Sequence, residues 1–311
     1  MKKILFLISF FFYIIDSSAQ QDPEYTHYMY NMSVVNPAYA TGTAAMLNTG
    51  ALYRTQWVGA VGSPKTFTFF GHTALSDKIE VGMSLISDDI GDGAKKENNF
   101  YADFAYILEL GGKNKLSFGL KAGLTSLQTN FNGFRFESGD VTTDLAFSQN
   151  INTTKPNIGA GAYYFTDKYY VGLSVPNLIN SKHIEEKAGI VAYGSEEIHA
   201  FLSGGYVFKI NDLFKLKPAF MSKFVVGSPI SVDVSANVLY NNKFELGVSY
   251  RYNDSFSGLM NISVMPNLRV GYAYDYTTSN LGQFNSGTHE ILLLFDLDLL
   301  GKGYDKSPRF F

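Results

Sequence analysis

Apolar and polar residues alternate with a period of two through most of the chain after Met46. Within 243–252 the even-numbered positions carry Phe, Leu, Val and Tyr, and the odd-numbered ones carry Lys, Glu, Gly, Ser and Arg. The stretches 116–125 and 267–277 repeat this division. Successive side chains of a strand point to opposite faces, so the pattern predicts strands with one apolar and one polar face.

About fourteen such strands can be placed along the chain. They are expected at 46–57, 64–75, 78–88, 97–109, 113–127, 155–165, 168–175, 197–209, 213–225, 230–240, 243–252, 255–265, 267–277 and 286–298. An even number of antiparallel strands is typical of outer-membrane barrels.

The connections between these strands alternate in length. Every second one is tight and carries turn residues, such as Ser76-Asp77 and Asn241-Asn242. The two longest, 128–154 and 176–196, both belong to the other set. Short turns at one end and long loops at the other indicate an all-β, transmembrane antiparallel β-barrel over 46–311. Its short turns and both chain termini are expected in the periplasm.

Composition supports a wall that faces lipid. The chain has 21 Tyr, 26 Phe and 29 Gly, and only 17% of its residues are charged. Aromatic girdles at the two membrane interfaces account for such a bias. A soluble periplasmic β-sandwich stays open as an alternative, because alternation alone does not say which face lies inside.

The N-terminal region divides into two parts. Two lysines, an apolar run at 4–15 and small residues at 17–19 are typical of a secretory signal peptide over 1–19. The following segment, 20–45, fits no strand. We expect it to plug the lumen or to dock a periplasmic partner, or else only to cap the base of the barrel.

Several charged residues fall on the polar face. They are Arg54, Lys121, Asp233, Glu245, Arg251, Arg269, Asp275 and Glu290. A basic residue facing lipid at the bilayer midplane costs about 2–4 kcal/mol, so these residues should face the lumen. Their mixed signs favour a narrow or blocked barrel over a charge-selective pore, although they could equally do no more than satisfy one another.

No pattern in the chain indicates catalysis. There is no Cys and there are five His; His199 and Ser203 share a face, but positions four apart on a strand lie ~13 Å from each other. The acidic stretch 88–93 lacks the spacing of a calcium loop. A net charge of -3 argues against nucleic acid as a partner. We therefore assign no catalytic residue, cofactor or metal ligand.

Several short strings occur in order along the chain: Tyr28-Met29-Tyr30-Asn31, Asn36-Pro37-Ala38-Tyr39-Ala40, Arg54-Thr55-Gln56-Trp57, Gly247-Val248-Ser249-Tyr250-Arg251, Gly271-Tyr272-Ala273-Tyr274-Asp275 and Gly287-Thr288-His289-Glu290. Together they resemble the PorP/SprF family of type IX secretion system membrane proteins. Thr288 stands where Ser is usual in the family, which keeps the hydroxyl. The positions that match the family motifs, and that we single out, are Asn36, Pro37, Tyr39, Arg54, Trp57, Arg251, Asp275, His289 and Glu290.

The resemblance implies a non-enzymatic outer-membrane component that works beside the type IX translocon or its periplasmic components. It implies a partner with a C-terminal targeting domain, such as an adhesin of the gliding type, which the barrel helps to export or holds at the surface. The alternative is an outer-membrane transporter or channel for small solutes, with 20–45 acting as a hatch.

Overall fold

A computed structural model describes residues 23–41, 46–132, 135–136, 139–140, 150–179, 198–299 and 301. The expected signal peptide, the chain termini and most of the two longest connections lie outside the described residues.

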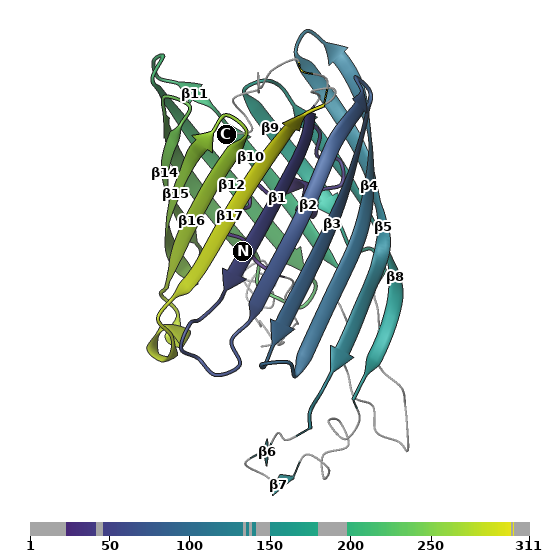
Figure 1. Cartoon of the computed structure of the whole chain (residues 1–311), viewed down its shortest axis with the longest axis vertical. Coiled ribbons are helices and arrows are strands. Elements are labelled where there is room, and N and C mark those ends of the chain that lie inside the picture. The colour runs from purple at the N-terminus through teal and green to yellow at the C-terminus, as the bar shows by residue number, and fades with distance from the viewer. Residues whose placement is uncertain are drawn as a thin grey trace, which may run out of the picture.

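Fourteen antiparallel strands form a closed barrel (Figure 1). They are β1 (Met46–Thr55), β2 (Lys65–Ser76), β3 (Ile79–Ile90), β4 (Lys95–Gly111), β5 (Asn114–Thr129), β8 (Asn152–Phe165), β9 (Tyr169–Val175), β10 (His199–Tyr206), β12 (Phe214–Val225), β13 (Ser231–Tyr240), β14 (Phe244–Arg251), β15 (Ser255–Met265), β16 (Leu268–Thr277) and β17 (Thr288–Asp298). Each strand pairs with its neighbour in the chain, β1 pairs with β17, and β10 pairs with β12. The predicted fold class is confirmed.

The remaining elements are small. The predicted strand 197–209 is split, because β10 ends at Tyr206 and a separate β11 (Phe208–Lys209) continues along β12 in the same register. Val207 lies between them, and its N–H donates to the Lys168 carbonyl (2.7 Å), which extends the pairing with β9 by one residue. The break coincides with Pro218 of β12, which lies opposite Tyr206 in this register and has no N–H to donate. β6 (Arg135–Phe136) and β7 (Gly139–Asp140) pair with each other. α2 (Met32–Val35) and the 3-10 helix η2 (Asn280–Phe284) are single turns, and no helix in the described residues is long and apolar enough to cross a membrane.

The two ends of the barrel differ in their connections. At one end, upward in Figure 1, tight connections join β2–β3, β4–β5, β8–β9, β10–β12, β13–β14 and β15–β16; we call it the short-turn end. The other, the long-loop end, carries the long connections 130–151 and 176–198. Met46 pairs with Asp298, so the barrel begins and finishes at the short-turn end. This confirms the predicted division of the connections.

The turn between β13 and β14 shows why its sequence is suited to a tight hairpin. Asn241 (φ 49°) and Asn242 (φ 53°) both adopt the left-handed conformation. The Lys243 N–H donates to the Tyr240 carbonyl (2.9 Å) and closes a turn with these two residues at its centre. A turn of type I′ needs positive φ at both central positions, and Asn tolerates that conformation better than most residues.

The two faces of the wall are inverted relative to a soluble protein. On β14 the side chain of Leu246 is 68% exposed on the outside, whereas that of Glu245 is 2% exposed. The inward placement predicted for the charged residues is confirmed, since Asp233 is partly buried and the other seven are buried. A soluble β-sandwich with an apolar interior is therefore excluded.

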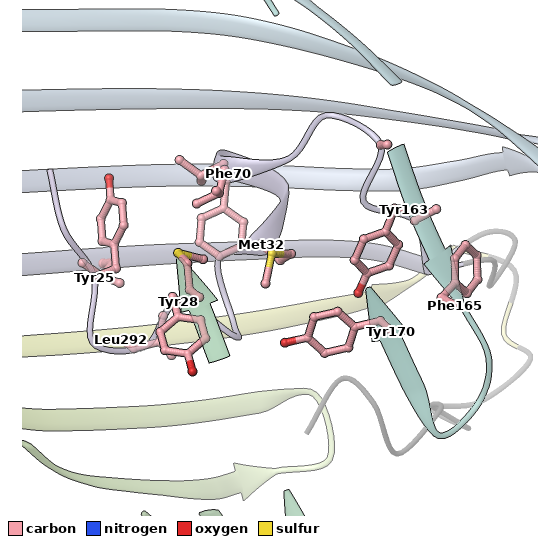
Figure 2. Close-up of a cluster of buried hydrophobic side chains, with 14 of the residues drawn as sticks. Tyr25, Tyr28, Met32, Phe70, Tyr163, Phe165, Tyr170 and Leu292 are labelled. Carbon is pink, nitrogen blue, oxygen red and sulfur yellow. The ribbon is translucent and has the colours of Figure 1, made fainter. Parts of the chain in front are cut away.

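The hydrophobic core lies inside the barrel, between the wall and residues 23–41, which we call the luminal segment. Tyr25, Tyr28 and Met32 of this segment pack against Phe70 of β2 and Leu292 of β17 (Figure 2). Further along, Val35 and Ala38 belong to the same cluster as Tyr163 and Tyr170 of β8 and β9. The predicted segment 20–45 therefore has its described residues, 23–41, in the lumen.

Candidate functional site

The luminal segment runs from one end of the barrel to the other. The Glu24 carboxylate pairs with Lys223 (2.5 Å) and Arg251 (3.0 Å), which lie where β12 and β14 finish at the long-loop end. At the short-turn end, the Thr41 N–H and hydroxyl donate to Glu80 (2.8 and 3.1 Å), close to the start of β3. The segment therefore crosses the whole lumen before the chain enters β1.

The first anchor of the segment joins it to three strands. Arg54 of β1 donates to Asp275 of β16 (2.8 Å) and to Glu290 of β17 (3.0 Å). The same guanidinium donates to the Thr26 hydroxyl (2.9 Å). The Glu290 carboxylate also accepts the backbone N–H groups of Thr26 and His27 (2.9 and 2.8 Å). All five residues are buried, so each charge depends on its partners for stabilisation.

The second anchor surrounds Tyr30, whose hydroxyl donates to Glu245 of β14. Lys217 of β12 pairs with Glu245 (3.0 Å) and donates to the Tyr30 hydroxyl (3.0 Å). Asn237 and Arg269 complete the set, at 2.8 and 3.8 Å from Glu245. Hydrogen bonds and ion pairs in a buried network of this kind hold its members in place, so they fix where Tyr30 can lie.

The third anchor holds Glu24 at the long-loop end. Arg251 pairs with Asp233 (2.8 Å) and Asp254 (3.4 Å) in addition to Glu24. Glu24 belongs to the luminal segment and not to a membrane-spanning strand. Burial alone would raise its pKa, but the opposite charges of Arg251 and Lys223 outweigh that effect and hold the pKa at about 2.

On the opposite side of the lumen the segment is held by close packing. A Cβ atom on Gly119 of β5 would lie 2.3 Å from the backbone of Pro37, and one on Gly161 of β8 would lie 2.2 Å from the Asn36 amide oxygen. The glycines therefore let the backbone of Pro37 and the side chain of Asn36 approach the wall. The Asn36 amide donates to the Ala162 carbonyl (3.2 Å) and accepts the Ala38 N–H (2.9 Å).

Seven of the nine positions singled out from the sequence meet at this interface. They are Asn36, Pro37, Tyr39, Arg54, Arg251, Asp275 and Glu290. The Tyr39 ring makes edge contacts with the rings of His72 and Tyr163, whose centroids lie 5.1 and 5.4 Å from its own.

The other two positions lie elsewhere. Trp57 is in the β1–β2 connection, with φ 47° and its N–H donating to the Thr288 hydroxyl (3.1 Å). His289 is on the outer face, with its Nδ1 2.7 Å from the Tyr272 hydroxyl. Neither takes part in the anchors described above.

Sequence reasoning missed some of the anchoring residues. Lys217 and Lys223 share the inward register of Met221 on β12, so the alternation could have identified them. Glu24 and Thr26 belong to an irregular segment without periodicity, and no signal in the sequence pointed to them.

The residues considered for catalysis or metal binding have other partners. The Ser203 hydroxyl donates to the Met32 sulfur (3.6 Å), within the packing of the luminal segment. In the acidic stretch 88–93, Asp89 accepts the Gly93 N–H (2.6 Å) and Asp92 pairs with Lys65 (3.1 Å). Within the described parts of the chain, no three His, Asp or Glu side chains are placed to hold a metal ion together.

Cavities lie on both sides of the luminal segment. One is at the long-loop end, beside Pro23 and Tyr25. Two others are toward the short-turn end, and both contact Met29 and Tyr30. The segment thus stands between the two mouths of the barrel, with a cavity at each.

A family model for type IX secretion system membrane proteins, PorP/SprF, matches residues 17–295. Among curated proteins none matches the chain.

Solved outer-membrane barrels are similar in fold. The CymD monoaromatic hydrocarbon channel is 12% identical with a TM-score of 0.51, and the match covers 85% of this chain and 91% of that one. A Pseudomonas aeruginosa FadL homologue is 12% identical with a TM-score of 0.46, covering 89% and 95%. The outer-membrane protein Omp33 of Acinetobacter baumannii is 9% identical with a TM-score of 0.46, covering 82% and 99%. At these identities the likeness concerns the fold alone.

Proposed function

The chain belongs to the PorP/SprF family and so is an outer-membrane component of type IX secretion, and we propose that it acts there as a non-enzymatic accessory. In this role it helps to export, or holds at the cell surface, a partner protein that carries a C-terminal targeting domain. An adhesin of the gliding type fits this description. The chain would act by recognition, without a cofactor or metal.

One observation carries the proposal: the luminal segment crosses the lumen and is tied to the wall by the ion pairs of Glu24 and by hydrogen bonds of Thr26 and Tyr30 with buried charged residues. A hydrogen bond to a charged group contributes about 1.5–3 kcal/mol. A polypeptide in transit through this lumen would have to displace Glu24, Thr26 and Tyr30 from all three anchors. Recognition at a mouth leaves those anchors intact, so it requires less free energy than transit of a polypeptide through the lumen.

We further propose that the long-loop end faces the cell exterior and that the partner binds there. Short turns at the periplasmic side are the rule for bacterial outer-membrane barrels. On this proposal the connections 130–151 and 176–198 face the secreted partner, and the short-turn end faces the translocon and periplasmic components.

The test is a mild-detergent purification of the tagged barrel from native outer membranes, with mass spectrometry of the proteins that accompany it. We expect a large secreted protein with a C-terminal targeting domain, together with translocon components. The matched control is the same barrel with 176–198 replaced by a tight turn, which should keep its translocon partners and lose the secreted protein. Recovery of the barrel alone in several detergents would contradict the proposal.

The competing candidate is a transporter for small solutes in which the luminal segment is a hatch. The observation in its favour is that cavities lie on both sides of the segment. Conductance in planar bilayers separates the two candidates. We expect the purified barrel to stay closed; a large, steady conductance would favour the transporter.

A further inference from the structure

The cavity at the long-loop end lies between the luminal segment and the wall; we call it the mouth cavity. Pro176 and Asn177, which follow β9, line one edge, and Ser231 at the start of β13 lines another. Its floor includes Tyr25 and Val34 of the luminal segment. The cavity is therefore reached from the long-loop end and closed below by the segment.

Aromatic side chains from separate elements converge on the mouth cavity. Tyr25 and Tyr28 come from the luminal segment, Tyr101 from β4 and Phe201 from β10. Met221 of β12 lies beside them. Aromatic rings attract one another most strongly in offset or edge-to-face arrangements, and methionine sulfur also favours contact with rings. This lining therefore favours a ring as the bound group.

The tyrosine hydroxyls already have hydrogen-bond partners in the protein. The Tyr25 hydroxyl lies 2.9 Å from that of Thr68, and the Tyr28 hydroxyl lies 2.8 Å from that of Ser235. The Tyr101 hydroxyl donates to the Asn99 side chain (3.1 Å). With the hydroxyls paired, the tyrosines present mainly carbon surface to the cavity.

The charged residues at the edge of the cavity are paired with one another. Glu24 pairs with Lys223 and Arg251, and Arg251 pairs with Asp233. A charged ligand would have to leave water without gaining a partner, which is unfavourable. An uncharged ligand meets no such penalty.

We propose that the mouth cavity is a binding site for an uncharged aromatic group. An apolar, concave site with a few polar groups at its edge is the usual form of a small-ligand pocket. The group could come from a free small molecule or from an aromatic side chain of a bound polypeptide. The proposal does not depend on the accessory role, so the purification described above neither supports nor contradicts it.

The test uses the full-length barrel in mild detergent, with 4-fluorobenzyl alcohol as the probe and broadening of its fluorine NMR signal as the measurement. Two variants obstruct the cavity: Ile86→Trp fills it from β3, and Ser231→Trp covers its edge. The matched control is Ser228→Trp in the connection just before β13, because Ser228 does not line the cavity.

We expect saturable binding to the parent chain and to Ser228→Trp, and roughly tenfold weaker binding, the factor for about 1.4 kcal/mol, to each obstructed variant. Broadening that does not saturate, or that is equal in all four chains, would overturn the proposal, because the probe would then only enter the micelle. Heat-modifiable electrophoretic mobility checks folding. If Ile86→Trp does not fold, the edge variant Ser231→Trp decides the outcome.

A second arm identifies the source of the ring. It uses the blocked peptide N-acetyl-glycyl-4-fluorophenylalanyl-glycine amide in place of the alcohol. Both outcomes uphold the site. Tighter binding of the peptide assigns the cavity to a polypeptide side chain, and tighter binding of the alcohol assigns it to a free small molecule.

Discussion

The two sides of the lumen hold the same segment by different physical means. Toward β12–β17 and β1, the contacts are ion pairs and charge-assisted hydrogen bonds around Arg54, Glu245 and Arg251. Toward β5 and β8, the Pro37 backbone comes close to Gly119 and the Asn36 side chain comes close to Gly161. Charged groups require particular partners, so the first side sets which residues of the segment lie where. Glycines only leave room for a neighbouring group, so the second side sets the distance between the segment and the barrel wall.

The largest effect is expected from Arg54→Met on the charged side. It leaves Asp275 and Glu290 buried without their counter-charge, which should lower the free energy of unfolding by about 3–5 kcal/mol. Heat-modifiable mobility in a urea series measures this. The control is Lys209→Ala, which removes an exposed pair with Asp212 (2.6 Å) and should produce no measurable change. Equal stability of the two variants would show that the buried charges do not anchor the segment.

Gly119→Ala tests the packed side. Its new methyl group would meet the backbone of Pro37, and overpacking of this kind costs about 1–3 kcal/mol. Because the chain has no Cys, Ser33→Cys in the buried α2 can report release of the segment through its labelling rate with a maleimide. We expect faster labelling than in Gly258→Ala, since a Cβ at Gly258 meets nothing within 4 Å. Identical rates would contradict the packing role of Gly119.

Asn36→Ala should have a smaller effect, a loss of about 1 kcal/mol, because it removes the hydrogen bonds to Ala162 and Ala38. Asn130→Ala is the matched control: its side chain accepts the Asn132 N–H (3.1 Å) in a similar local arrangement, but on the surface. Urea unfolding of both variants measures the difference. An equal loss in the two would mean that the luminal position of Asn36 adds nothing.

The smallest effect near neutral pH is expected from protonation of Glu24. Its pKa in the folded chain is about 2, below the ordinary value of 4.5, so its contribution to stability is present above pH 4.5 and declines as the pH falls toward 2. Labelling of Ser33→Cys, carried out at each pH with a disulfide reagent that also reacts with thiols in acid, such as 4,4′-dithiodipyridine, should be constant between pH 8 and 5. Loosening already at pH 6 would indicate that another group controls docking.

Much of the barrel could be predicted from the chain alone. The alternation placed all fourteen strands, and the one substantial difference, the break after Tyr206, coincides with Pro218 on the neighbouring β12, which has no N–H to donate to the ladder. The same alternation put Arg54, Asp275 and Glu290 on the inner face. Family motifs pointed to Asn36 and Pro37, although only the structure showed that glycines on two strands receive them.

The sequence by itself therefore determined the strands, their two faces and the ends at which the connections are short or long. These properties are local, because a period of two fixes which way each side chain points. Only the tertiary structure decided that residues 23–41 fill the lumen and that Glu24 meets Lys223 and Arg251. Those contacts join residues far apart in the chain. They depend on how the closed sheet positions its strands around a segment whose sequence has no periodicity.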